Sequence, residues 1–142
     1  MKYMILTTII SSILISCEPD CRKKGGHDSI LFKNNSNRNI EVKIVDNYPD
    51  TILYETYNPL NDQGSYIPPN SHWKIGSSGP QPVCFEKIYG EGNSHWFYVF
   101  DYDSLITLSW DTVRITGRGI LERRKVDLNY LIQQNFTFVY EE

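Results

Sequence analysis

The chain has 142 residues and a net charge of −3, from 14 Lys and Arg against 17 Asp and Glu. This balance argues against a general nucleic-acid binder, because affinity for a polyanion comes mainly from clustered cations. The chain contains no alanine, whereas Ile, Tyr, Phe, Val and Thr are plentiful. This composition argues against a mostly helical protein, and the length fits one domain.

Residues 1–16 predict a removable signal peptide. After Lys2, residues 4–16 carry no charge, and thirteen residues are fewer than the roughly twenty that cross a bilayer as a helix. The leader ends in Leu14-Ile15-Ser16-Cys17, which resembles the lipobox of bacterial lipoproteins. The resemblance implies diacylglycerol on the Cys17 sulfur, cleavage before Cys17 and a membrane as partner through the lipid. The alternative is a plain secretory signal with an incidental cysteine.

Residues 17–28 predict a lipidated tether, because they are charged, contain glycine and lack apolar periodicity. The folded domain is expected over residues 29–142. The acidic residues of Glu18-Pro19-Asp20 resemble the surface-export signals of lipoproteins in Bacteroidetes, although a proline interrupts them. The sequence thus predicts a cell-envelope protein at the outer membrane and leaves open which side of that membrane the domain faces.

The three cysteines predict one disulfide. With lipid on Cys17, the remaining Cys21 and Cys84 have a single pairing in an oxidising compartment. Chain entropy predicts about 4 kcal/mol of stabilisation for a loop of this length. Free thiols or an intermolecular bridge are the alternatives. A zinc site is disfavoured, because the cysteines do not form the close pairs that such sites use.

Short alternating runs separated by Gly, Pro, Asn and Asp predict a mainly β fold, a single antiparallel β-sandwich of about eight strands with one or two short helices. Ile40, Val42 and Ile44 alternate with Glu41 and Lys43, which indicates a half-buried strand. The strands are expected over residues 29–33, 40–44, 51–57, 83–89, 96–100, 112–116, 120–126 and 136–140, with a further edge strand over 72–75.

Two features of this pattern are local. Gly117-Arg118-Gly119 predicts a hairpin between the runs 112–116 and 120–126. Two short helices are expected, one over 104–109 capped by Asp103 and one over 128–134 capped by Asp127. In the second, Leu128, Leu131 and Ile132 fall on one face.

Several segments of the domain resemble small lipoproteins of unknown function from gut Bacteroidetes. The resemblance covers most of the chain after residue 28 and implies an envelope location and a β-rich domain, with no assigned chemistry. The segments that carry it are Phe32-Lys33-Asn34-Asn35-Ser36, Tyr48-Pro49-Asp50-Thr51, Trp110-Asp111-Thr112-Val113, Asp127-Leu128 to Leu131, and Asn135-Phe136-Thr137 with Tyr140.

A tripeptide of Asp, Ser or Thr, and an aliphatic residue occurs four times, where chance gives about 0.3. It is similar to the O-glycosylation signal of exported Bacteroidetes proteins, which makes the four hydroxyls candidate glycosylation sites. The alternative is structural, because the same pattern suits a turn entering a strand or a helix cap. The candidate hydroxyls belong to Ser29, Thr51, Ser104 and Thr112.

The tetrapeptide Asn-Ser-His-Trp occurs at residues 70–73 and again at 93–96. Two histidines with Asp101 or Asp103 nearby would offer metal ligands, but the spacing defines no third ligand, so equivalent turns entering two strands are favoured and no metal is predicted. The same two aspartates would offer an acid and base pair, although turn residues are the simpler interpretation.

The 19 aromatic residues permit a carbohydrate-binding face, because flat rings stack on sugars while Asn and Asp bind hydroxyls. Trp96 and Trp110 are expected in the core. Tyr66 and Trp73, in the loop-rich middle, are the candidate ligand-binding residues. The basic run of Arg114, Arg118, Arg123, Arg124 and Lys125 is interpreted as a solvated surface.

No catalytic or cofactor motif is present: the chain has no Gly-x-Ser-x-Gly, no His-Glu-x-x-His and no phosphate loop. The sequence therefore predicts a non-enzymatic, lipid-anchored envelope protein without a cofactor, which binds something or supports an assembly. A glycan or an envelope protein is the expected partner. A glycan-binding accessory lipoprotein is the first alternative, and a small hydrolase with an unrecognised site is the second.

Overall fold

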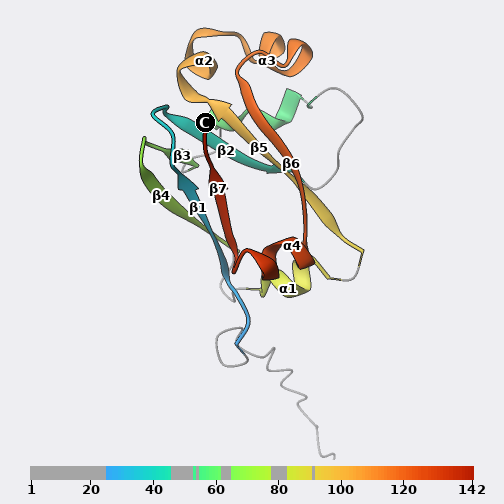
Figure 1. Ribbon diagram of the computed structural model, residues 1–142. Helices are drawn as coiled ribbons and strands as arrows, with labels where there is room; N and C mark the ends of the chain where they lie inside the picture. The colour runs from blue at the N-terminus through green and yellow to red at the C-terminus, as the bar shows by residue number, and fades with distance from the viewer. Residues whose placement is uncertain (1–24, 46–52, 54, 62–64, 78–82, 91) are drawn as a thin grey trace, which may run out of the picture.

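The computed structural model describes residues 25–45, 53, 55–61, 65–77, 83–90 and 92–142. They form the mainly β fold that the sequence predicts, with two sheets packed face to face and short helices at both ends (Figure 1). The elements are β1 (Ser29–Asn34), β2 (Ile40–Val45), the 3-10 turns η2 (Glu55–Tyr57) and η3 (Pro59–Asn61), β3 (Tyr66–Ile67), β4 (Ser71–Gly76), α1 (Phe85–Ile88), β5 (Ser94–Asp101), α2 (Tyr102–Thr107), α3 (Trp110–Thr116), β6 (Ile120–Asp127), α4 (Leu128–Gln133) and β7 (Thr137–Tyr140).

The two sheets have different strand orders. The first, sheet A, has the order β4-β1-β7, and the second, sheet B, has the order β3-β2-β5-β6. All paired neighbours are antiparallel except β1 and β7, which run parallel with Phe32 opposite Phe138. The expectation of a purely antiparallel sandwich is therefore wrong at this pair. The described residues hold seven strands.

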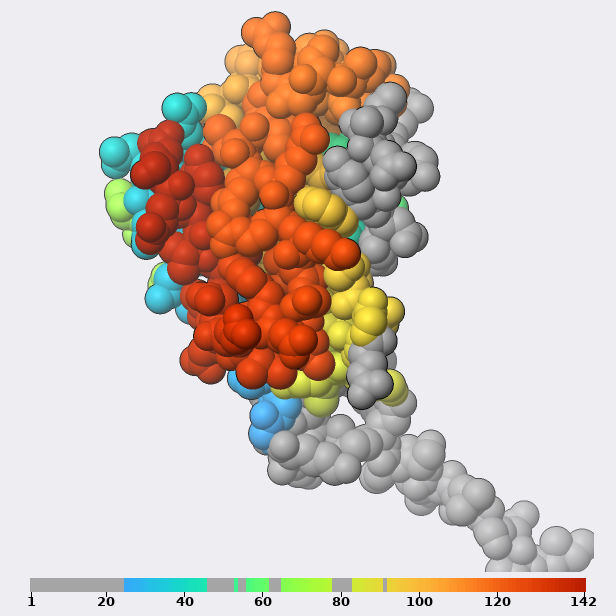
Figure 2. Space-filling model, turned by 45° about the vertical axis from the view of Figure 1, so that its right-hand side comes forward, coloured from blue at the N-terminus to red at the C-terminus, as the bar shows by residue number. Residues whose placement is uncertain are grey.

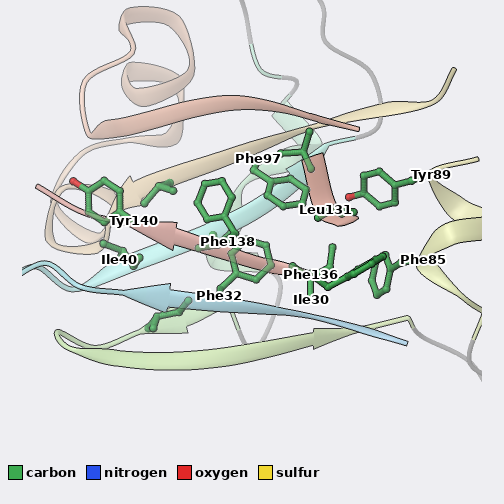
Figure 3. Packing of buried hydrophobic residues seen from close by; sticks show 14 residues of the cluster. Ile30, Phe32, Ile40, Phe85, Tyr89, Phe97, Leu131, Phe136, Phe138 and Tyr140 are labelled. Atoms are coloured by element: carbon green, nitrogen blue, oxygen red, sulfur yellow. The ribbon is translucent and has the colours of Figure 1, made fainter. Parts of the chain in front are cut away.

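The inner layer lies between the two sheets and is the main core (Figure 3). Phe32, Phe97 and Phe138 come from β1, β5 and β7, and their ring centroids lie 5.2, 5.4 and 5.3 Å apart. These three rings join the sheets. The buried residues of the inner layer are Ile30, Phe32, Ile40, Val42, Ile67, Phe85, Tyr89, Phe97, Val99, Val126, Leu131, Phe136, Phe138 and Tyr140.

An outer layer covers the opposite face of sheet B. Its buried members come from sheet B, from α2 and α3, and from residue 53, and Trp96 and Trp110 pack against it as the sequence predicts. The strand Ile40–Val45 is therefore covered on both faces, and Glu41 is buried with 4% of its surface exposed. The expectation of a half-buried strand is wrong here. The buried residues of the outer layer are Val45, Leu53, Tyr98, Phe100, Leu105 and Val113.

Two runs predicted as strands are helical. Residues 112–116 lie in α3, which Ser109 caps by accepting a hydrogen bond from the Thr112 N–H, and which ends at Gly117 with φ at 75°. These two capping signals outweigh the β-branched composition, so the predicted hairpin is absent. In the run 83–89, Phe85 and Tyr89 are four residues apart and both buried, which is helical spacing for α1.

Of the remaining local predictions, one helix cap is confirmed and the other is wrong. Asp127 caps α4 as predicted, whereas α2 is capped by Asp101 and not by Asp103. Leu131 is buried but Ile132 is 57% exposed, so it does not share the apolar face. Residues 55–57 of the predicted strand 51–57 form η2, and residues 51, 52 and 54 lie outside the described part.

Among the described residues, no helix is long and apolar enough to cross a membrane.

Candidate functional site

A shallow cleft of about 410 Å³ lies where η2 and η3 meet the start of α3. We call it the α3 cleft. Its volume is at the lower end of the range for small-molecule sites, about 300–1,000 Å³. The lining joins one large aromatic side chain to short polar ones: Thr56, Asn58, Asn61, Ser109, Trp110 and Asp111.

The Trp110 indole is held in place by a ring of sheet B. It is half-buried, and it meets the Phe100 ring of β5 edge to face with a centroid distance of 6.0 Å and an interplanar angle of 65°. This contact ties the indole to the outer layer while the residue also lines the cleft. An aromatic residue held in this way offers a rigid apolar surface to a ligand.

The polar residues around Trp110 keep hydrogen-bonding capacity. Asn58 Oδ1 accepts from the Leu60 N–H at 3.1 Å, and Asp111 Oδ1 accepts from Arg114 Nε at 2.6 Å. The amide of Asn61 and the hydroxyl of Thr56 have no side-chain hydrogen bond within the described ranges. The α3 cleft therefore presents both donors and acceptors to a ligand.

A second cleft, of about 390 Å³, lies at the opposite end of sheet B, between α1 and α4. We call it the α4 cleft. Asp127 is committed to capping α4 through a 2.8 Å hydrogen bond from the Tyr130 N–H, and Tyr89 is almost fully buried. Lys125 is exposed. The lining residues are Tyr89, Gly90, Gly92, Asn93, Ser94, Lys125, Asp127, Leu128 and Asn129.

The predicted ligand-binding residues Tyr66 and Trp73 are exposed by 41% and 47%. Tyr66 donates its hydroxyl to Asn39 Oδ1 at 2.8 Å and packs edge to face against Tyr102. Trp73 lies on the edge strand β4 opposite Phe32. They belong to different sheets and line neither cleft, so the structure does not bring them into one site with Trp110.

A buried carboxyl lies under η3, on the outer face of sheet B. Burial raises the pKa of Glu41 to about 7, against the opposing effects of Lys43 and of a hydrogen bond from the Ser65 backbone. Burial also lowers the pKa of Lys43, although Glu41 counteracts the shift. The outer face of β2 therefore carries two neighbouring ionisable residues, Glu41 and Lys43, whose charged forms are both disfavoured by burial.

The Asn-Ser-His-Trp repeats open strands β4 and β5, as the structural interpretation predicts. His72 lies on sheet A and His95 on sheet B, where its ring is 4.1 Å from Tyr89. Within the part of the chain that the structure describes, no three His, Cys, Asp or Glu residues are placed to hold a metal ion.

The candidate glycosylation motifs stand at the beginnings of elements. Ser29 opens β1, while Ser104 and Thr112 lie in the first turns of α2 and α3, and each is half-buried. The aliphatic residue that follows each hydroxyl is buried, as Ile30, Leu105 and Val113. This burial explains the spacing of the motif without a glycan, and glycosylation stays a prediction. Thr51 lies outside the described residues.

Asp101, of the candidate acid and base pair, and Arg124, of the basic run, both make structural contacts. Asp101 caps α2 and forms an ion pair with Arg38 at 3.0 Å, while Asp103 is exposed. Arg124 is not a simple solvated residue, because its guanidinium lies 4.6 Å from the Phe138 ring centroid and donates to the Tyr130 hydroxyl at 2.6 Å. It also pairs with Glu122.

Cys84 precedes α1 and is disulfide-bonded. Its partner lies outside the described residues, so the pairing with Cys21 stays a prediction. Cys17, the predicted lipidation site, also lies outside them.

Sequence reasoning missed Thr56, Asn58 and Asn61 as cleft residues. They lie in a segment predicted as strand and loop, and only the contact of η2 with α3 brings them beside Trp110. The available signal was the Asn58-Pro59-Leu60-Asn61 sequence, in which two amides flank a buried proline.

Comparison of the chain with models of protein families, with curated proteins and with solved structures finds no match.

Proposed function

We propose that this protein is a lipid-anchored lipoprotein of the bacterial cell envelope, at the outer membrane, whose β-sandwich binds a carbohydrate without chemical turnover. The lipobox-like Leu14-Ile15-Ser16-Cys17 supports the anchor. The α3 cleft supports the binding role, and it is the observation that carries the proposal, because it places Trp110 beside two side-chain amides and a carboxylate.

The chemistry of the α3 cleft suits a sugar. One face of a pyranose ring is apolar and stacks on an indole, while its hydroxyls both donate and accept hydrogen bonds. Asn58 and Asn61 offer amide donors and acceptors, and Asp111 offers a carboxylate. The volume of about 410 Å³ is small, so the proposal assigns the cleft a short segment of a glycan chain.

The anchor is tested by growing expressing cells with labelled palmitate and measuring the intact mass of the purified protein. Wild-type protein should carry the label, and Cys17→Ser should carry none. Unlabelled wild-type protein with a free Cys17 thiol would overturn the anchor. Protease treatment of intact and lysed cells then decides whether the domain faces the periplasm or the outside.

The binding role is tested on a glycan array, followed by calorimetry with the best ligand. Asn61→Ala should weaken binding about tenfold, which corresponds to 1.4 kcal/mol. This variant should fold normally, because Asn61 is exposed. Trp110→Ala should abolish binding. Trp73→Ala, on an exposed indole outside the cleft, is the matched control and should bind normally.

The control also tests the sequence prediction. If Trp73→Ala weakens binding and Asn61→Ala does not, the ligand binds at β4 and the α3 cleft is not the site. If no glycan binds, the carbohydrate proposal is wrong, and a structural role in an envelope assembly becomes the better explanation.

A further inference from the structure

The chain joins the folded domain at the end that carries α1 and α4, and His27 fixes it there. The His27 backbone N–H donates to both carboxylate oxygens of Glu86, at 3.1 and 3.0 Å, and the His27 carbonyl accepts from the Phe85 N–H at 2.8 Å. The imidazole Nδ1 lies 2.7 Å from Glu86 Oε1. The ring stacks on Phe136 with a centroid distance of 3.7 Å and an interplanar angle of 10°.

These contacts hold His27 from two parts of the fold. Glu86 and Phe85 belong to α1, and Phe136 lies between α4 and β7, so His27 contacts α1 and the segment that follows α4. Partial burial works to raise the pKa of Glu86, but the hydrogen bonds that its carboxylate accepts from the His27 side chain and from the backbone of Glu86 and His27, together with the charge of His27, lower that pKa below its ordinary value. The carboxylate therefore stays charged at neutral pH, and the contact with His27 persists.

The fixed point limits how far the domain can stand from a lipid on Cys17. Gly25, the first described residue, is eight residues from Cys17, and eight extended residues span at most about 28 Å. The disulfide of Cys84 lies at the same end, at the start of α1. If its partner is Cys21, as predicted, the disulfide holds Cys21 at this end of the domain. Cys21 is four positions after Cys17 in the sequence, so the lipid is then attached within about 14 Å of it.

The other end of the sandwich is distant from this attachment. In sheet B, Ser94 of β5 pairs with Asp127, the cap of α4, whereas Asp101 at the far end of β5 caps α2. An eight-residue strand is about 25 Å long. Figure 1 shows α1 and α4 at one end and α2 and α3 at the other, and Figure 2 shows α4 beside the first described residues, in blue.

We propose that the end formed by α1 and α4 rests on the membrane surface, and that the α3 cleft consequently points away from the bilayer. This inference rests on the proposed lipid anchor. The end offers a surface that fits a bilayer interface, because α4 exposes Ile132 by 57% and the α4 cleft, at the start of the same helix, is lined by the exposed Lys125. An apolar side chain enters the headgroup region, and a lysine pairs with anionic headgroups.

The test uses two exposed isoleucines at opposite ends as a matched pair. Ile132 lies on α4 with 57% exposure, and Ile115 lies on α3 with 59% exposure. Each is replaced, in the full lipidated protein, by a genetically encoded photo-crosslinking amino acid. The two proteins are reconstituted into vesicles of phosphatidylethanolamine and phosphatidylglycerol and irradiated, and protein–lipid adducts are measured by mass spectrometry.

The crosslinker at position 132 should give several-fold more lipid adduct than the crosslinker at position 115. Equal yields, a higher yield at 115, or no adduct at either position in lipidated protein would overturn the orientation and leave the anchor intact. An intact mass without lipid would overturn the anchor and the orientation together. The double variant His27→Ala and Cys84→Ser removes the His27 side-chain contacts and the disulfide. In this variant the ratio of adduct at position 132 to adduct at position 115 should fall toward one. An unchanged ratio would show that these contacts do not set the orientation.

Discussion

The two faces of sheet B are covered by layers of different character. The inner layer buries fourteen apolar and aromatic residues between the sheets, and three phenylalanine rings cross it. The outer layer buries six, under short helices and 3-10 turns, and Glu41 and Lys43 belong to the same face of β2. The inner layer is thus the larger apolar core, while the outer layer also holds the ionisable residues Glu41 and Lys43 and borders the α3 cleft.

Replacing Phe97 with alanine should give the largest effect and would mark the inner layer as the main core. Phe97 is fully buried between both sheets, and such a truncation costs about 3–5 kcal/mol. The matched change in the outer layer, Leu105→Ala, should cost about 2 kcal/mol, at the low end of the range for leucine. Urea unfolding followed by tryptophan fluorescence measures both, with the disulfide intact. Equal losses would contradict the difference between the layers.

The pH dependence of stability should come from the outer layer. The pKa of Glu41 is about 7 in the folded protein and takes the ordinary value of 4.5 in the unfolded chain. Between pH 4.5 and 7, Glu41 therefore keeps its proton in the folded state but loses it in the unfolded chain. Stability should therefore be greatest below pH 4.5 for this group and should fall as the pH rises from 4.5 to 7, by up to about 3 kcal/mol.

Glu41→Gln tests this directly, because glutamine keeps an acceptor for the Ser65 N–H and never ionises. The variant should be more stable than the wild type at pH 8 and similar to it at pH 4.5, as unfolding at the two pH values would reveal. A wild-type profile that keeps its slope in the variant would place the titrating group elsewhere. Lys43 is the charged neighbour that moderates the effect.

Helix caps should give the smallest effect and should be equal in the two layers. Ser109 caps α3, which supplies Val113 to the outer layer, and Asp127 caps α4, which supplies Leu131 to the inner layer. Either residue replaced by alanine should lower stability by about 1 kcal/mol, because the lost hydrogen bond is local. Thermal unfolding checks this, and a much larger loss at Ser109 would show that α3 holds the outer layer together.

The difference between the layers also marks how far sequence reasoning reached. Alternation in β2 identified Ile40, Val42 and Ile44 as the face toward the inner layer, and the apolar run of β5 indicated a central strand, because each pattern follows from the period of the strand itself. Covering of the outer face by α2, α3 and η3 depends on residues far away in sequence. The burial of Glu41 was consequently missed.

The helix α3 shows the same limit at short range. Thr112, Val113 and Ile115 favour a strand by composition. The segment is nevertheless helical, because Ser109 and Gly117 cap the two ends of α3. The α3 cleft needs this helix to bring Trp110 against Asn58 and Asn61, so an error in one element hid the site. Tyr66 and Trp73 were chosen because they lie in the loop-rich middle of the sequence; both side chains are exposed, but exposure alone does not identify a shared site.

The parallel pairing of β1 with β7 has a consequence for how the chain folds. Phe32 and Phe138 are direct neighbours in the sheet although 106 residues separate them in sequence. Such distant contacts slow folding, because loop closure must precede any gain from packing. Until β7 is synthesised, one edge of β1 is unpaired and the contacts of the Phe138 ring with Phe32 and Phe97 are missing. A chain shortened by its final strand would therefore expose a strand edge suited to association with other chains.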